Sequence, residues 1–174
     1  KNIKISIFGQ SHSKGMGVSI DGLPAGKSID EIALQKFMSR RAPGQGDHTT
    51  SRKEADQIEI LSGIIEGKTC GAPIGAIIHN MDTISEDYKQ LVDVPRPSHA
   101  DFTSRIKYKG FQDYRGGGHF SGRLTAALVA AGVVAEKILK SHFPDCTCNA
   151  KVLSIGGNSQ LEEAVQHAIA LNDT

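Results

Sequence analysis

The amino-acid sequence predicts a mixed fold, α/β or α+β, in which strands and amphipathic helices intermix along the chain. Near the N-terminus, Ile3, Ile5 and Ile7 alternate with polar residues, a period of two that is typical of a half-buried strand. Residues 124–139 instead keep apolar side chains at helical spacing over several turns. No strict strand–helix–strand repeat is present, so both fold classes stay open on these patterns alone.

A second short strand is expected at residues 18–20, close enough to the first for the two to form a hairpin. The connecting segment, residues 8–17, is rich in glycine and small polar residues and carries His12 near its tip. A histidine in this place is either merely exposed or an acid/base group, and position alone leaves both readings open.

The first helix is predicted after Ser28 and Glu31, which have the spacing of a capping box. Apolar residues within 32–38 form one face, and the helix is expected to end near Arg40 and Arg41. Two readings are open for these arginines. They complement the negative end of the helix dipole, or they bind an anionic ligand.

Strand residues are expected around Ile58 and Ile60 and again across 69–80. Pro73 suggests that the second of these is an edge strand, or that the proline takes an early position in it. The polar residues 82–90 that follow are weakly helical in composition.

His99 lies in a segment whose prolines favour an extended approach to a helix. Ser98 and Asp101 have capping-box spacing, so the sequence predicts a helix whose first turn contains His99. The positive end of the helix dipole disfavours an imidazolium there, which suits an acid/base group.

A glycine loop, residues 115–118, precedes the long apolar segment and predicts an anion-binding loop at the start of a helix. Ser121 can cap that helix. Cationic or proton-carrying side chains beside the loop are Arg115, His119 and Arg123. The alternative is an exposed glycine hinge before a core helix, because such runs are weak motifs.

The C-terminal part predicts a strand over residues 148–153 that ends at Gly156 and Gly157. Ser159 and Glu162 then have the spacing of a cap for a last amphipathic helix. No internal repeat or low-complexity tract is found.

Composition narrows the classes of function. The chain has 20 lysine and arginine residues against 19 acidic ones, which argues against a nucleic-acid partner. Its three cysteines lack the second pair that a structural zinc site needs, so no metal is expected. The apolar run at 126–135 is far shorter than the roughly 20 residues of a membrane span. The sequence therefore predicts a soluble, cytoplasmic protein with no membrane partner.

Several motifs, in the right order, together resemble the chorismate synthase family. They are Gly9-Gln10-Ser11-His12, Asp21-Gly22-Leu23-Pro24-Ala25-Gly26, Arg40-Arg41-Ala42-Pro43-Gly44-Gln45, Gly71-Ala72-Pro73-Ile74, Arg96-Pro97-Ser98-His99-Ala100-Asp101 and Asp113-Tyr114-Arg115-Gly116-Gly117-Gly118. The sequence differs from the usual family residues at Asp47, His119, Phe120 and Leu124.

The resemblance implies an α/β fold with the family's own layered β-α-β arrangement. It also implies a carbon–oxygen lyase that converts 5-enolpyruvylshikimate 3-phosphate to chorismate in aromatic amino-acid biosynthesis. The family requires reduced FMN and forms a homotetramer. Whether a nicotinamide cofactor (NADP) or an external reductant reduces the flavin stays open.

The resemblance also implies roles for individual residues. It makes His12 and His99 the acid/base pair, one serving the departing phosphate and the other the flavin. Substrate-binding residues by the same resemblance are Arg40, Arg41, Ser121 and Arg123, and cofactor-binding residues are Gly116, Gly117, Gly118 and His119.

Family members are considerably longer, and residues 172–174 resemble a family motif cut in its middle. We therefore expect residues 1–174 to be the N-terminal half of a chorismate synthase domain, with a partial fold. Two alternatives are a non-catalytic module that binds an anion or flavin, and an isolated fragment that is inactive on its own.

Overall fold

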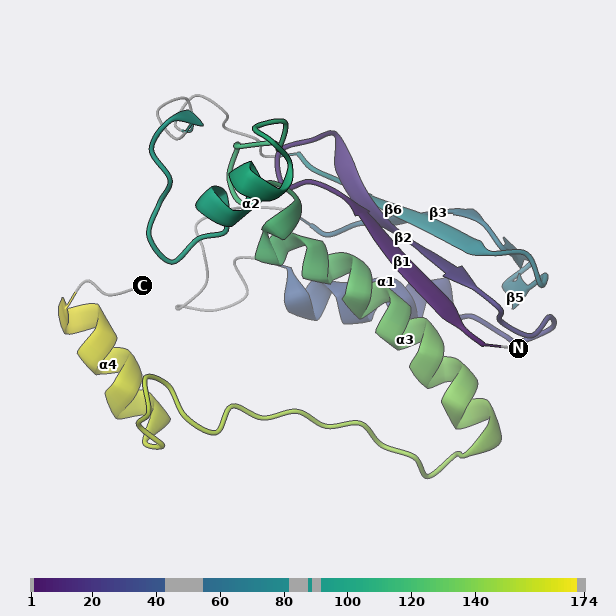
Figure 1. Cartoon of the computed structure of the whole chain (residues 1–174). Coiled ribbons are helices and arrows are strands. Elements are labelled where there is room, and N and C mark those ends of the chain that lie inside the picture. Colours follow the sequence, from purple (N-terminus) through teal and green to yellow (C-terminus); the bar gives the residue numbers. More distant parts are fainter. Residues whose placement is uncertain (1, 43–54, 82–87, 89–91, 172–174) are drawn as a thin grey trace. The chain divides into compact units, whose positions relative to one another are not determined.

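The structure is a computed structural model that describes residues 2–42, 55–81, 88 and 92–171 (Figure 1). The chain divides into two compact units, Lys1–Pro144 and Asp145–Thr174, and each is described by itself.

The first unit is built on a four-stranded antiparallel sheet with the order β1-β2-β6-β3 (Figure 1). Its strands are β1 (Lys4–Gly9), β2 (Gly15–Asp21), β3 (Ile58–Ser62) and β6 (Ile74–His79). The predicted hairpin is confirmed, since β1 pairs directly with β2 and the segment with His12 connects them.

Two helices cover one face of the sheet, α1 (Glu31–Arg41) and α3 (Thr125–His142) (Figure 1). The sheet residues that face them are apolar and buried because successive side chains of a strand point to opposite faces. The sheet contributes Met16, Val18, Ile20, Ile74, Ala76 and Ile78 to this core. Full burial of each larger side chain stabilises the fold by about 1.5–3 kcal/mol.

α3 lies against the sheet through small residues. Its buried face includes Ala126, Ala127, Ala130 and Ala131, with Val133 and Val134. Small side chains let a helix backbone approach its neighbours closely, so α3 fits beside both the sheet and α1. The long helix predicted from the apolar spacing is confirmed.

Shorter elements complete the first unit. A small hairpin is formed by β4 (Ile64–Ile65) and β5 (Lys68–Thr69). The helical pieces are α2 (Asp101–Lys107) and the two 3-10 turns η2 (Gly118–Phe120) and η3 (Gly122–Leu124). Figure 1 shows α2 beside the β1–β2 loop, at the end of the sheet where α3 begins.

Two local predictions were wrong, those for the cap of α1 and for a strand at 148–153. α1 begins at Glu31 because Asp30 is its N-cap and accepts from the amide of Ala33 at 2.9 Å, so Ser28 is not the cap. Of the two readings of Pro73, the early position is confirmed, because Pro73 directly precedes β6, which is a central strand. Residues 148–153 form no strand, and a single bridge joins Ile155 to Asn158.

The second unit contains α4 (Leu161–Leu171), which agrees with the last helix predicted. The weak helix expected at 82–90 lies outside the described residues except for Tyr88. No helix in the described part of the chain is long and apolar enough to cross a membrane.

Candidate active site

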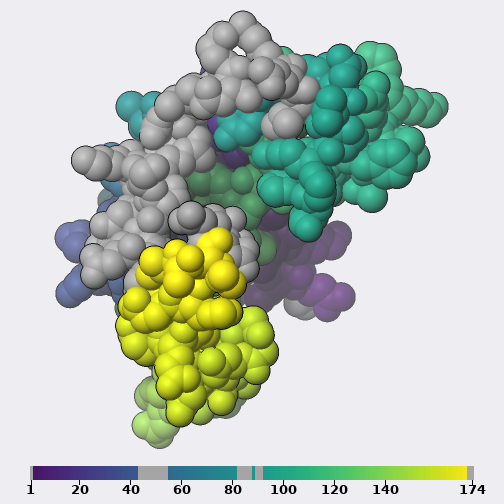
Figure 2. All heavy atoms as spheres, turned by 90° about the vertical axis from the view of Figure 1, so that its left-hand side faces the viewer, coloured from purple at the N-terminus to yellow at the C-terminus, as the bar shows by residue number. Residues whose placement is uncertain are grey.

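A polar hollow of about 350 Å³ brings together His12 and His99, although the two lie far apart in the sequence. Its wall also contains Ser121, Gly116 and Gly117. In Figure 2 the residues around α2, coloured teal, form a continuous lobe at this end of the first unit. Five residues predicted for the site therefore meet in one place.

His12 is held by its neighbours in the β1–β2 loop. Its Nδ1 lies 2.9 Å from the buried hydroxyl of Ser11, and the amide of Ser11 donates to the carbonyl of Gly118 at 3.1 Å. The ring meets Tyr88 edge to face, with 4.8 Å between centroids. These contacts fix the imidazole against the glycine loop.

Gly116 explains why the loop needs glycine here. Its φ is +58°, and a Cβ at this position would lie 2.5 Å from the Nδ1 and Cε1 atoms of His12. Any side chain would therefore both strain the backbone and displace the imidazole.

The local structure around His99 differs from the prediction. α2 begins only at Asp101, with Ala100 as an N-cap that offers no side-chain bond, so His99 precedes the helix and Ser98 does not cap it. Ser98 instead adopts a positive φ of 60°, and the Nδ1 of His99 lies 3.0 Å from the carbonyl of Pro97. The argument from the helix dipole is therefore wrong, although His99 still lines the hollow.

An ion pair that the sequence reasoning missed ties the His99 segment to the glycine loop. Arg96 bonds to both carboxylate oxygens of Asp101, through Nε at 2.9 Å and Nη2 at 3.0 Å. Its Nη2 also donates to the carbonyl of Gly116 at 2.6 Å. The side-chain hydrogen bond from Arg96 holds the pKa of the Asp101 carboxyl below its usual value.

A second pair occupies the arginine of the glycine loop. Arg115 donates from Nε and Nη2 to the two oxygens of Asp113, each at 2.8 Å. Burial raises the pKa of the Asp113 carboxyl, but the hydrogen bonds from Arg115 outweigh it, so the pKa lies below its ordinary value. Arg115 is thus paired with Asp113 within the loop, whereas the sequence suggested that Arg115 lies beside a bound anion.

The glycine loop turns back on itself before α3. The amide of Gly118 donates to the carbonyl of Arg115 at 3.0 Å, and the amide of Phe120 donates to that of Gly117 at 2.9 Å. These two amides therefore serve turns and do not point to a ligand. Ser121 does not cap the long helix as predicted: its hydroxyl accepts from the amide of Arg123 at 3.2 Å and caps η3, whereas α3 has Leu124 as an N-cap without a side-chain bond.

The three arginines expected to bind substrate do not line the hollow that holds the histidines. Arg41 and Arg123 both bond to Asp56, a buried carboxylate just before β3. Arg40 is exposed and stacks over the ring of Phe37, with 4.7 Å from its guanidinium carbon to the ring centroid. Their roles toward substrate stay predictions.

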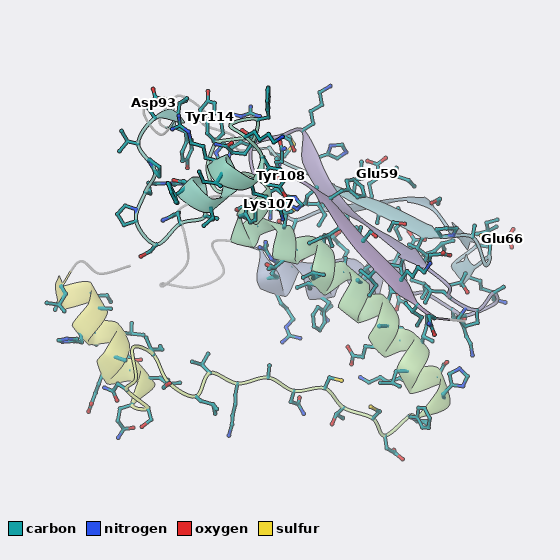
Figure 3. The ribbon with its side chains drawn as sticks, in the orientation of Figure 1. Glu59, Glu66, Asp93, Lys107, Tyr108 and Tyr114 are labelled. Atoms are coloured by element: carbon teal, nitrogen blue, oxygen red, sulfur yellow. The ribbon has the colours of Figure 1, made fainter. Side chains whose placement is uncertain are left out.

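A second hollow, of about 250 Å³, lies between α2 and the glycine loop and shares Gly117 and Phe120 with the first. It contains His119, whose Nδ1 lies 3.3 Å from the carbonyl of Gly9. Tyr108 and Tyr114, both drawn in Figure 3, line it as well. His119 is thus separated from the two histidines of the first hollow.

Among the described residues, no group of three histidine, cysteine or acidic side chains is placed to hold a metal ion. The three cysteines, Cys70, Cys146 and Cys148, form no disulfide.

Comparison with known proteins places these features in a family. A family model described as chorismate synthase matches residues 3–173. The chorismate synthase of Helicobacter hepaticus is 48% identical over 156 residues, which cover 90% of this chain and 43% of the relative. That of Chitinophaga pinensis is 45% identical over 171 residues, covering 98% of this chain and 50% of the relative.

A solved structure supports the same assignment. A crystal structure of chorismate synthase superposes with a TM-score of 0.61 at 31% identity, covering 82% of this chain and 35% of that one. The predicted α/β fold resembling chorismate synthase is thereby confirmed. The chain spans half or less of the length of these relatives. It belongs to the chorismate synthase family.

Proposed function

We propose that the protein serves as a chorismate synthase, a carbon–oxygen lyase of aromatic amino-acid biosynthesis. It would eliminate phosphate from 5-enolpyruvylshikimate 3-phosphate, with loss of one hydrogen, to give chorismate. The observation that carries the proposal is the shared hollow of His12 and His99 beside the glycine loop. Relatives named chorismate synthase at 45–48% identity support it.

The two histidines are suited to different tasks. His12 packs against Gly116, and its Nδ1 is held by Ser11, so its position is fixed well enough to give a proton to the departing phosphate. His99 is exposed at the hollow and is suited to a bound cofactor. Ser121 adds a hydroxyl to the same wall and would bind the substrate there.

Reduced FMN is part of the proposal, and it supplies an electron-rich ring beside the substrate when bound. The hollow offers imidazole and hydroxyl groups, which suit the polar edge of a flavin ring. Arg96, in contrast, is already bonded to Asp101 and Gly116. We propose that Gly116 and Gly117, which line this hollow, help to hold the ring. Gly118 and His119 would act from beside it, since His119 lines the adjoining second hollow, and we assign the FMN phosphate to none of these residues.

The wider context is proposed from the family alone. It comprises a homotetramer, a location in the cytoplasm and reduction of the flavin by the reduced form of the nicotinamide cofactor NADP (NADPH) or by an external reductant. The residues 1–174 would be the N-terminal half of the catalytic domain, because the relatives are longer than this chain. The alternatives are a non-catalytic anion or flavin module, and a chain that is inactive without further sequence.

Turnover of 5-enolpyruvylshikimate 3-phosphate with reduced FMN tests the proposal. It should be measured on this chain and on a chain extended to the length of the family. We expect chorismate from the extended chain and little or none from 1–174. If neither chain forms chorismate, the proposed activity is wrong, whereas robust turnover by 1–174 contradicts only its dependence on further sequence.

Replacing His12 or His99 by Ala should lower turnover by about 10²-fold or more if both act in proton transfer. The matched control is His79→Ala. His79 is an exposed histidine on β6 that pairs with Glu59 at 3.0 Å and lies outside the hollow. Turnover at the wild-type rate in the two active-site variants would reduce these histidines to structural residues.

A further inference from the structure

One buried carboxylate joins Arg41 and Arg123, two of the arginines for which the family resemblance implies substrate binding. Asp56 is only 2% exposed. Its Oδ2 lies 2.6 Å from Nη1 of Arg41, and its Oδ1 accepts from Nη1 of Arg123. Each oxygen therefore serves a different guanidinium, and the three side chains form one unit, which we call the Asp56 cluster.

The cluster connects three elements that are distant in the sequence. Arg41 is the last residue of α1, Asp56 precedes β3, and Arg123 lies in η3. Gln35 of α1 fixes the backbone around Asp56, since its amide donates to the carbonyl of Asp56 at 3.4 Å and accepts from Ile58 at 3.0 Å. Asp56 itself has a φ of 46°, which aspartate and asparagine tolerate better than most residues.

The cluster reaches the hollow of the histidines through Gly122. This glycine lines the hollow, and its carbonyl lies 3.5 Å from Nη2 of Arg41. The Arg41 side chain is 24% exposed, whereas that of Arg123 is 4% exposed. Arg41 is thus the member of the cluster that an anion at this edge of the hollow can reach.

The guanidinium of Arg41 also has hydrogen-bond donors beyond those that its contacts within the described part of the chain use. A guanidinium carries five N–H groups in a fixed planar fork. Within the described residues, Nη1 bonds to Asp56 and Nη2 makes one long contact to Gly122. The bond to Asp56 fixes the plane of the fork, so the remaining donors have a defined direction.

We propose that Asp56 is a positioning residue that orients Arg41, with Arg123 as its second anchor, toward an anionic group of the substrate. The proposal rests on the proposed function, because the anion is a carboxylate or the phosphate of 5-enolpyruvylshikimate 3-phosphate. Without the carboxylate the two guanidiniums lose their common partner, repel each other and no longer present a fixed fork.

The test is equilibrium binding of 5-enolpyruvylshikimate 3-phosphate to the wild-type chain, to Asp56→Asn, to Arg41→Ala and to the double variant. We expect Asp56→Asn to weaken binding by about 10- to 100-fold, the value of a charge-assisted hydrogen bond. Because Asp56 acts through Arg41, the double variant should bind no more weakly than Arg41→Ala alone. Glu59→Gln, which removes an exposed carboxylate from the neighbouring β3, should bind as the wild type does.

Steady-state kinetics with reduced FMN on the chain that turns over separates positioning from structural damage. An orientation role raises KM about 10-fold or more with kcat within about threefold, because it affects ground state and transition state alike. Partial unfolding would lower kcat and leave KM unchanged. If the Asn variant does not fold, Asp56→Glu replaces it, since it keeps the charge and moves the carboxylate by one methylene.

The outcomes are distinct. Wild-type affinity and KM in a folded Asp56 variant overturn the proposal while the proposed function stands. Additive losses in the double variant also overturn it, because Asp56 would then act independently of Arg41. Failure of both the wild-type chain and its extended form to bind the substrate overturns the proposed function and this inference together.

Discussion

The Asp56 cluster and the Arg96–Asp101 pair both use arginine and carboxylate, yet they differ in geometry. Asp101 takes both bonds from one guanidinium, whose Nη2 also bonds to Gly116. Asp56 gives one oxygen to each of two guanidiniums. The first arrangement uses Nε and Nη2 of its arginine within the protein, whereas the second uses Nη1 and one long contact of Nη2 of Arg41.

Burial separates the two regions further. The Asp56 side chain is fully buried, while the Arg96 and Asp101 side chains are 25% and 18% exposed. Removal of a carboxylate therefore has different consequences in the two places. Near Asp101 water can solvate the arginine that remains, whereas near Asp56 it reaches Arg41, which is 24% exposed, but hardly Arg123, which is 4% exposed. The difference indicates that Arg96–Asp101 shapes the hollow and that the Asp56 cluster is coupled to the core as well as to the site.

The largest effect is expected from Asp56→Ala. It should lower the free energy of unfolding by about 3–5 kcal/mol, because it removes the buried carboxylate that pairs with two guanidiniums, one of which, Arg123, is almost fully buried. Asp101→Ala should cost only about 1–3 kcal/mol, since the remaining arginine reaches water. Urea unfolding of both variants measures the comparison. Equal losses would show that burial does not distinguish the two regions.

A smaller loss of stability is expected from Gly116→Ala, which changes a residue whose carbonyl accepts a hydrogen bond from Arg96. The new Cβ would collide with His12 and the residue would keep a positive φ, at a cost of about 1–3 kcal/mol. Turnover by the extended chain should fall as the imidazole shifts.

The matched control for that variant is Gly132→Ala in α3, where a Cβ would meet no atom within 4 Å. A helix gains about 0.5–1 kcal/mol from this change. Thermal unfolding of both variants shows whether each substitution raises or lowers the stability of the chain. A stable, active Gly116→Ala chain would contradict the close approach of the glycine loop to His12.

The smallest effect is the acid dependence of stability. The pKa of Asp101 lies below its usual value in the folded chain, mainly because Arg96 donates to it. Its stabilising contribution is therefore complete above the unfolded pKa of about 3.9 and is lost as the pH falls through the folded pKa. The urea midpoint of Asp101→Asn should consequently fall less steeply than that of the wild type below about pH 4. Identical slopes would contradict a lowered pKa.

Local patterns predicted much of the fold. The helical spacing after Leu124 predicted α3, because a helix buries one side of its own segment. The alternation at Ile5 and Ile7 predicted the first strand, although Ile5 is 47% exposed in β1 and Ile7 is half-buried. Prediction failed where the pattern was short. The apolar residues at 148–153 look like a strand, yet no partner strand pairs with them among the described residues.

The candidate site was predicted in part. His12, His99 and Ser121 meet, as the motifs indicated, although the helix argument for His99 was wrong. Asp56 was missed entirely. It lies between Ala55 and Gln57, and nothing in the local sequence shows that its partners are Arg41 and Arg123. Contacts between buried charges depend on how whole helices and strands pack together. The hydrophobic periodicity of a single segment does not predict that packing.

The close approach of Gly116 to His12 also has a consequence for sequence change in this protein. Because no side chain at position 116 fits beside an imidazole at position 12, the two positions cannot vary independently. A larger residue at 116 would remain strained by the positive φ, and its Cβ would still lie 2.8 Å from the hydroxyl of Ser11, even after the ring had gone. Position 116 is therefore restricted to glycine by its own backbone and by Ser11, and the imidazole at position 12 adds a further restriction.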